Sequence, residues 1–127
     1  MQVSTTMNKA SKIIIWVLVS LLAALFLLSA VPKFIDEGWI HRFASWGYSE
    51  IFLYIIATLE ALGAIGLLMP KTSPWAAAGL IGIMIGAIYI HLTHDQGIWW
   101  NIAYITLLSI VGIYRWKERA AQNLTAA

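Results

Sequence analysis

The chain has 127 residues, of which 61% are hydrophobic and 11% are charged, and its mean hydropathy is +0.78. Because a soluble domain usually carries about 25% charged residues, this composition excludes an ordinary soluble domain and indicates a single membrane domain. The net charge of +2 comes from basic residues that form no stripe along the sequence, so a nucleic-acid partner is not expected.

The chain begins with a polar segment, residues 1–12, which we expect to be a poorly ordered tail. An apolar run follows over 13–31 and ends at Pro32 and Lys33. A basic start before an apolar run is typical of a cleaved signal peptide, but this run exceeds the usual ~7 to 15 residue core and lacks a good cleavage site. The sequence therefore favours a first transmembrane helix over 13–31.

The segment 36–49 connects the first two apolar runs and is amphipathic. Its apolar side chains recur at helical spacing, with polar side chains opposite them. These apolar residues are Ile35, Trp39, Ile40, Phe43 and Trp46. We expect a short helix that lies in the membrane interface, with its tryptophans at headgroup depth.

The run 51–69 is almost unbroken apolar sequence with one carboxylate, Glu60, at its centre. At ~1.5 Å per residue it is about 28 Å long, close to the ~30 Å hydrocarbon core of a bilayer. Glu60 is therefore expected near the midplane, where an ionised carboxylate costs at least ~2.5 kcal/mol on insertion scales. We expect it to face the other helices and either to bind a partner group or to keep its proton.

Two further spans are predicted over about 75–91 and 98–114, followed by a basic cytoplasmic tail over 115–127. Small residues give the third span a smooth face for helix contact, and another lies near Glu60 in the second span. The predicted helix-packing glycines are Gly63, Gly79, Gly82 and Gly86. The pattern predicts an all-α polytopic membrane protein whose one domain, 13–114, is a four-transmembrane-helix bundle with a short interfacial helix between helices 1 and 2.

Lysine and arginine set the expected orientation in the lipid bilayer. In a four-span topology the basic residues divide unequally between the two sides. One side has Lys9, Lys12, Lys71, Arg115, Lys117 and Arg119, and the other has Lys33 and Arg42. The positive-inside rule then predicts a multi-pass protein of a bacterial-type inner or plasma membrane with both termini cytoplasmic. Most tryptophans and histidines fall on the outer side, so polar chemistry is expected to open outward.

Four short motifs follow one another along the spans. They are Lys33-Phe34, Phe43-x-x-Trp46-Gly47-Tyr48, Glu60 with Gly63 and Leu67-Leu68, and Met84-x-Gly86-Ala87 before His91. Over about 13–114 their order and spacing resemble the DoxX-like family of small four-span membrane proteins, with Ser49 departing from the proline that is common there. The resemblance implies this fold, and either quinone-linked oxidation in the respiratory membrane or a role as an assembly factor or chaperone.

The outward ends of the helices are expected to form a ligand pocket. Its predicted floor is Glu60, and its rim is Lys33, His91, Asn101 and Tyr104. A quinone needs an apolar slot, hydrogen-bond donors for two carbonyls and a proton path. We expect His91 and Tyr104 to donate, Glu60 to carry the proton, and Lys33 to attract negative charge.

These residues also have structural interpretations. Glu60 could be a neutral carboxyl that is hydrogen-bonded to the hydroxyl of Tyr104 or Thr106. Lys33 lies at the outer boundary, where a lysine ordinarily extends to the headgroups. For Lys33 this interpretation is preferred unless Asp95 or a bound anion pairs with it.

Secondary candidates follow the third span. His91, His94 and Asp95 form an H-x-x-H-D motif in which a shared proton or metal is conceivable on a continuing helix. A metal site needs three or four convergent ligands, so no metal is expected, and haem is disfavoured although His41 could supply a second axial ligand. The chain has no cysteine, which excludes dithiol chemistry within this chain.

Trp99 and Trp100 are also secondary candidates. Adjacent residues point to different sides of a helix, so only one of the two can line a cavity. Tryptophans near helix ends ordinarily anchor at the interface.

Three functions remain open at this point, and the sequence does not decide whether the protein is an enzyme. The first is a redox-associated subunit with a quinone-type or small lipophilic ligand, which needs a partner redox subunit because the chain has no evident electron carrier. The second is a non-enzymatic assembly, scaffold or chaperone-like protein that docks on a client or forms a homo-oligomer through its glycine-rich span. The third is a small proton-coupled transporter, since four-span multidrug exporters also use one membrane glutamate, although in their first span.

Overall fold

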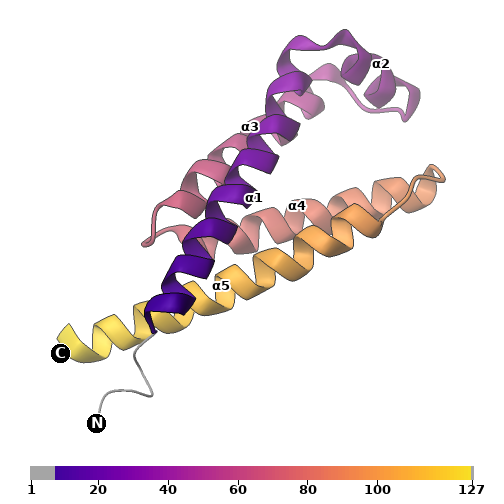
Figure 1. Cartoon of the computed structure of the whole chain (residues 1–127). Coiled ribbons are helices and arrows are strands. Elements are labelled where there is room, and N and C mark those ends of the chain that lie inside the picture. The colour runs from indigo at the N-terminus through magenta and orange to yellow at the C-terminus, as the bar shows by residue number, and fades with distance from the viewer. Residues whose placement is uncertain (1–7, 127) are drawn as a thin grey trace.

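The structure is a computed structural model that describes residues 8–126, without the side chains of 125 and 126. Helices make up all the regular structure in this range, which contains no strand, and this confirms the predicted all-α class. The helices are α1 (Lys9–Ile35), α2 (Glu37–Ser45), α3 (Glu50–Leu68), α4 (Ser73–Thr93) and α5 (Trp99–Ala126) (Figure 1).

The start of α1 lies within the segment that was predicted to be a poorly ordered tail. The side chain of Asn8 caps the helix by accepting a hydrogen bond of 2.7 Å from the backbone N–H of Ser11. The expectation of disorder is therefore wrong for residues 9–12, while residues 1–7 lie outside the described range. At its other end α1 continues through Pro32 to Ile35, and the backbone N–H of Asp36 donates to the carbonyl of Pro32 at 2.7 Å.

The remaining helices follow the predicted segments with shifted ends. A nine-residue α2 occupies the amphipathic connection, and the side chain of Asp36 caps it through the N–H of Gly38. At the start of α3 the hydroxyl of Ser49 accepts from the N–H of Phe52, at 3.2 Å. The predicted tail 115–127 is helical as far as Ala126, since α5 does not end at the membrane boundary that was predicted from hydropathy.

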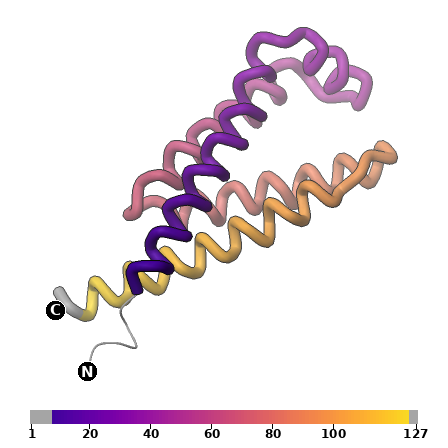
Figure 2. The backbone as a smooth tube through the Cα atoms, viewed as in Figure 1, coloured from indigo at the N-terminus to yellow at the C-terminus, as the bar shows by residue number. Residues whose placement is uncertain are grey.

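The long helices form two pairs that diverge. α1 packs mainly against α3, and α4 packs mainly against α5. Figures 1 and 2 show the pairs meeting near the start of α1 and spreading apart toward α2 and the loop between α4 and α5. The hydrophobic core lies where the pairs meet and includes Val19, Leu22, Phe26, Leu67, Leu80 and Leu108.

Close contact between the pairs depends on two glycines of α3. A Cβ at Gly63 would lie 2.6 Å from Cδ2 of Leu80, and one at Gly66 would lie 2.9 Å from Cβ of Ala76. A side chain at either position requires Leu80 or Ala76 of α4 to shift. Gly79, Gly82 and Gly86 differ, because a Cβ at each would meet nothing within 4 Å.

The outer surface of the long helices is apolar, as a lipid environment requires. Large hydrophobic side chains such as Leu28, Ile55, Leu62 and Ile85 are exposed. By length and hydropathy α1, α3 and α4 are able to cross a membrane. These features indicate a membrane protein in contact with the lipid bilayer.

Candidate functional site

An ion pair between α1 and α3 is the most buried charged feature of the cavity between the helix pairs. Nζ of Lys33 lies 2.9 Å from Oε1 of Glu60, and the two side chains are only 8% and 4% exposed. Side chains of an α-helix tilt toward its N-terminus. The helices α1 and α3 run in opposite directions. The side chain of Lys33 therefore leans toward the N-terminus of α1, the side chain of Glu60 leans toward the N-terminus of α3, and their charged groups meet.

The ammonium group of Lys33 is fully engaged. It donates to the backbone carbonyl of Ser29 at 3.0 Å and to the hydroxyl of Ser29 at 2.8 Å, in addition to its bond with Glu60. It also lies 4.7 Å from the centre of the Trp39 ring, at the distance of a cation–π contact. Lys33 therefore does not extend to the headgroups, and the interpretation preferred from its position in the sequence is wrong.

The structural interpretation of Glu60, a carboxyl hydrogen-bonded to the hydroxyl of Tyr104 or Thr106, also differs from what the structure shows. Thr106 donates its hydroxyl to the carbonyl of Ile102 at 2.9 Å, and the ring of Tyr104 packs against that of Phe26 with centroids 5.0 Å apart. Neither hydroxyl is a hydrogen-bond partner of Glu60. The carboxylate is paired with a cation and not with a neutral hydroxyl.

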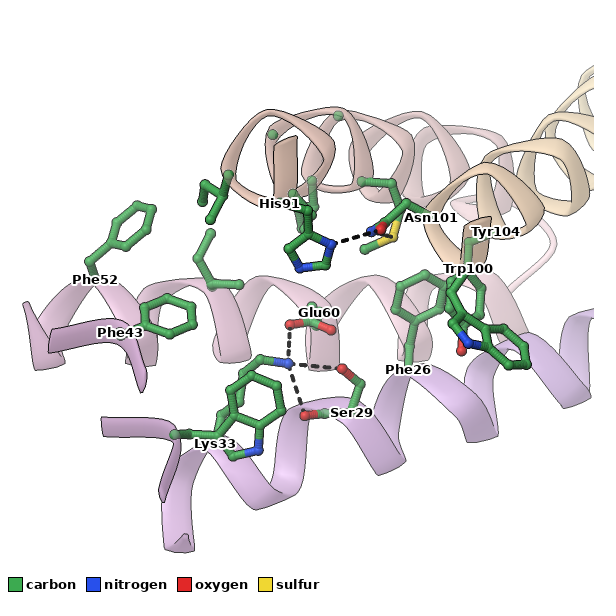
Figure 3. A pocket seen from close by; sticks show the side chains of 18 of the residues that line it. Phe26, Ser29, Lys33, Phe43, Phe52, Glu60, His91, Trp100, Asn101 and Tyr104 are labelled. Atoms are coloured by element: carbon green, nitrogen blue, oxygen red, sulfur yellow. Dashed lines mark hydrogen bonds and ion pairs between the residues drawn. The ribbon is translucent and has the colours of Figure 1, made fainter. Parts of the chain in front are cut away.

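A cavity of about 580 Å³ lies between the two helix pairs, and Glu60 and Lys33 form part of one wall (Figure 3). All five primary candidate residues line it: Lys33, Glu60, His91, Asn101 and Tyr104. Aromatic rings supply much of the remaining lining, among them Phe26, Phe43, Phe52, Trp39, Trp46 and Trp100. Residues from every described helix thus contribute to a single, predominantly apolar chamber.

The wall opposite the ion pair carries a second polar group. Nδ1 of His91 lies 3.1 Å from the carbonyl oxygen of Gly97 and 3.1 Å from Oδ1 of Asn101. The amide nitrogen of Asn101 contacts the sulfur of Met84 at 3.6 Å. Figure 3 shows the imidazole between Asn101 and Glu60, with its other nitrogen directed away from Asn101.

The secondary candidates divide between the cavity and its surroundings. Trp100 lines the cavity and Trp99 does not, although both are 80% exposed. His94 is hydrogen-bonded through Nδ1 to the carbonyl of Ile90 at 2.8 Å, and its ring lies 5.3 Å from that of Trp46. Asp95 is exposed, with a φ of 55°. Within residues 8–126 no cluster of three or more His, Cys, Asp or Glu residues is placed to hold a metal ion.

The four predicted packing glycines lie in two different environments. Gly63 packs closely against α4, whereas Gly79, Gly82 and Gly86 line the cavity and have open space above them. Within this chain, the smooth face of α4 therefore borders a chamber and not a neighbouring helix.

Sequence reasoning missed several residues of the cavity. Ser29, Trp39, Trp46 and Gly97 were not among the candidates, yet all four line it. One usable signal was the four-residue spacing from Ser29 to Lys33, which places both side chains on one helix face. Another was that Lys33 and Glu60 are opposite charges at or within apolar runs, where an unpaired charge is costly.

A comparison with known protein families gives one match. The family model of the DoxX-like family matches residues 17–113. No curated protein and no solved structure matches the chain. The matched range includes α2, α3 and α4 and most of α1, and it contains every residue of the cavity wall. The chain is a member of the DoxX-like family.

Proposed function

We propose that this protein is a four-span integral membrane protein that binds a small lipophilic ligand of the quinone type in an outward-opening pocket and acts with a redox partner. The observation that best supports this proposal is that the five primary candidate residues come from four helices and line one cavity. They are Lys33, Glu60, His91, Asn101 and Tyr104. A buried ion pair at the wall of an apolar chamber is a typical arrangement for a ligand site.

Crossing of the membrane by α5 is part of this proposal. Its mean hydropathy falls below that of the other long helices because it carries polar residues, most of them after Tyr114. Two others, Asn101 and Tyr104, line the cavity. Its exposed side chains in the same stretch include Ile102, Ile110 and Ile113, which suit lipid. We therefore assign four spans, with α2 in the outer interface and both termini cytoplasmic by the positive-inside rule.

The size and lining of the cavity fit a ring-shaped lipophilic ligand. Pockets for small molecules usually have volumes of about 300–1,000 Å³, and the cavity of about 580 Å³ lies within that range. Its aromatic lining suits a flat ring, and the ion pair and His91 offer polar contacts at facing walls. Since the chain supplies no thiol and no evident electron carrier, a redox role requires a partner subunit or a soluble donor.

The proposal is tested by the lipids that co-purify with the protein. The full chain is purified from bacterial membranes in a mild detergent, and quinones are extracted and quantified per mole of protein. We expect near-stoichiometric quinone with the wild type and at least about a tenfold loss with Glu60→Gln, because an interaction with a buried charge contributes ~1.5–3 kcal/mol.

The matched control is Glu50→Gln. Glu50 is exposed, accepts a hydrogen bond from Tyr54 and does not line the cavity, so this variant is expected to retain quinone. Wild-type protein that is free of lipophilic ligand after mild purification, and also fails to bind added quinone and added hydroquinone, would disprove the proposal.

A second candidate function is docking of another helix, as in a scaffold or assembly protein. It is favoured by the exposed glycines of α4, Gly79, Gly82 and Gly86, which leave room for close approach. Crosslinking in intact membranes distinguishes the two functions. A stoichiometric partner that survives Glu60→Ala and is lost with Gly82→Leu supports docking.

A further inference from the structure

We infer that the cavity selects a lipophilic ligand whose polar groups donate hydrogen bonds, such as a hydroxylated ring, over a ligand whose polar groups only accept them, such as a dicarbonyl ring. The inference rests on the proposed ligand-binding function. It goes further by assigning the direction of the hydrogen bonds at both polar walls, and it follows from the partners that the cavity residues already have.

At one wall, the neighbours of His91 determine which ring nitrogen carries the proton. The carbonyl oxygen of Gly97, 3.1 Å from Nδ1, can only accept a hydrogen bond, so Nδ1 carries the hydrogen. In a neutral imidazole the other nitrogen, Nε2, then has a lone pair and accepts. No described protein group is hydrogen-bonded to Nε2, and Figure 3 shows this nitrogen directed away from Asn101 toward the wall of Glu60.

The amide of Asn101 does not alter this assignment. Its two polar atoms are interchangeable in their placement, but the backbone carbonyl of Gly97 is not, and it alone requires a hydrogen on Nδ1. Asn101 acts as a positioning residue that holds the imidazole in one orientation. The donor role expected for His91 toward a ligand carbonyl is thus replaced by an acceptor role.

At the opposite wall, the ammonium group of Lys33 has no proton left to offer. Its three N–H groups are matched by three acceptors: Oε1 of Glu60 and the carbonyl and hydroxyl oxygens of Ser29. A carboxylate paired with a lysine is an acceptor only. Its second oxygen, Oε2, has no hydrogen-bond partner among the described residues, and Glu60 lines the cavity although its side chain is only 4% exposed.

Both walls therefore present lone pairs to the same chamber. The hydroxyl of Tyr104 rotates and takes either role, so it does not favour one class of ligand. The indole N–H groups of Trp39, Trp46 and Trp100 belong to half-buried or exposed residues, where water and headgroups supply partners. A hydroxyl of the ligand can donate to Nε2 of His91 or to Oε2 of Glu60, whereas a carbonyl places its own lone pairs against them.

The test compares three probes that share one ring and one tail: decylhydroquinone, its dimethyl ether and decylbenzoquinone. Each is titrated into the purified full chain in detergent without oxygen, and affinity is measured by isothermal titration calorimetry. We expect the hydroquinone to bind about ten- to a hundredfold more tightly than either other probe, since a hydrogen bond to a charged group has about that effect. No electron transfer is involved in this measurement.

The outcomes separate the inference from the function on which it rests. Equal or tighter binding of the benzoquinone or the dimethyl ether overturns the inference and leaves the ligand-binding function standing. Absence of binding by all three probes overturns both. The comparison uses only wild-type protein, so it does not depend on whether any variant folds.

Two variants locate the selectivity. His91→Phe keeps a ring and removes the acceptor, so the ratio of hydroquinone to benzoquinone affinity is expected to fall about tenfold with little change for the benzoquinone itself. Glu50→Gln, outside the cavity, is the matched control and should leave the ratio unchanged. A ratio that His91→Phe does not change would show that the selectivity, if present, comes from elsewhere, and would overturn the assigned role of His91.

Discussion

At the scale of single residues, the buried pair formed by Lys33 and Glu60 has a large energetic consequence. Removing two charges from water is costly, and their attraction compensates only when geometry and additional hydrogen bonds are good. Here the pair has a 2.9 Å contact and two further bonds from Lys33 to Ser29. Loss of one partner leaves the other as an uncompensated buried charge.

This argument predicts non-additive effects of substitution at the pair. Lys33→Met and Glu60→Met, made singly, are each expected to lower the free energy of unfolding by about 3–5 kcal/mol. The double variant is expected to recover most of this loss, because it contains no unpaired charge. Stability is measured by denaturant unfolding in mixed micelles, followed by circular dichroism.

The same double variant separates structural from functional roles. We expect it to fold and yet to lose the co-purified lipophilic ligand, since the polar wall is gone. If the single variants are as stable as the exposed control Glu50→Gln, the pair is not buried as described. If the double variant keeps its ligand, the pair serves structure alone.

How far the sequence predicts the site depends on the residue. The expected inward orientation of Glu60 follows from the cost of a carboxylate in lipid, and the side chain is 4% exposed. The position of Lys33 could not be predicted from depth alone. Its pairing depends on the antiparallel arrangement of α1 and α3 and on side-chain tilt, which become known only with the neighbouring helix.

At the scale of elements, the glycines of α3 are closely packed against α4, whereas the glycines of α4 border open space. The face of Gly63 is closed by Leu80, which is 1% exposed, with Cδ2 at 2.6 Å and Cγ at 2.7 Å from where a Cβ would lie. Because the leucine is itself enclosed, it has little room to move. The face of Gly82 borders the cavity and is open.

This difference predicts a matched pair of results. Gly63→Ala is expected to lower the free energy of unfolding by about 1–3 kcal/mol through overpacking. Gly82→Ala is expected to leave it unchanged or to raise it by up to ~1 kcal/mol, because alanine favours helix more than glycine. Both are measured by the same unfolding assay, and equal destabilisation by the two substitutions would contradict the packing described.

A larger side chain on α4 tests the chamber itself. Gly82→Leu adds volume at a position that lines the cavity, so we expect loss of co-purified ligand with little change in unfolding. Quantifying extracted ligand per mole of protein gives the readout. Retention of ligand by a folded Gly82→Leu variant would show that the ligand occupies another place.

The elements themselves were largely predictable, and the exceptions have physical causes. Apolar runs and the amphipathic spacing of 36–49 locate all five helices, but hydropathy ends α1 too early because the helix continues past Pro32. It also ends α5 too early, since the polar residues that follow the apolar run favour helix as well. The glycine spacing of α4 predicts a smooth face, but spacing alone does not distinguish a neighbouring helix from a chamber.

At the scale of the whole molecule, the divergence of the two helix pairs creates the cavity. A bundle with all helices parallel in close contact would leave no chamber of this size, and α2 lies at the wide end (Figures 1 and 2). No local pattern encodes this divergence. At the narrow end, contact of α3 with α4 at Gly63 and Gly66 brings the two pairs close together.

The number of membrane crossings is the property of the whole molecule on which orientation, outward opening and the role of α5 all depend. Because the chain has no cysteine, single cysteines can be introduced without background labelling. Suitable exposed positions are Ser45, Lys71, Gln96 and Asn123. Each is replaced by cysteine and treated in intact cells with a membrane-impermeant maleimide.

In the four-span topology, cysteines at 45 and 96 react from outside, and those at 71 and 123 react only after the cells are opened. The decisive position is 123, at the far end of α5. If α5 does not cross the membrane, 123 lies on the same side as 96 and reacts from outside with it. Since Asn101 and Tyr104 of α5 line the cavity, that result would also place the polar wall of the chamber outside a closed membrane domain.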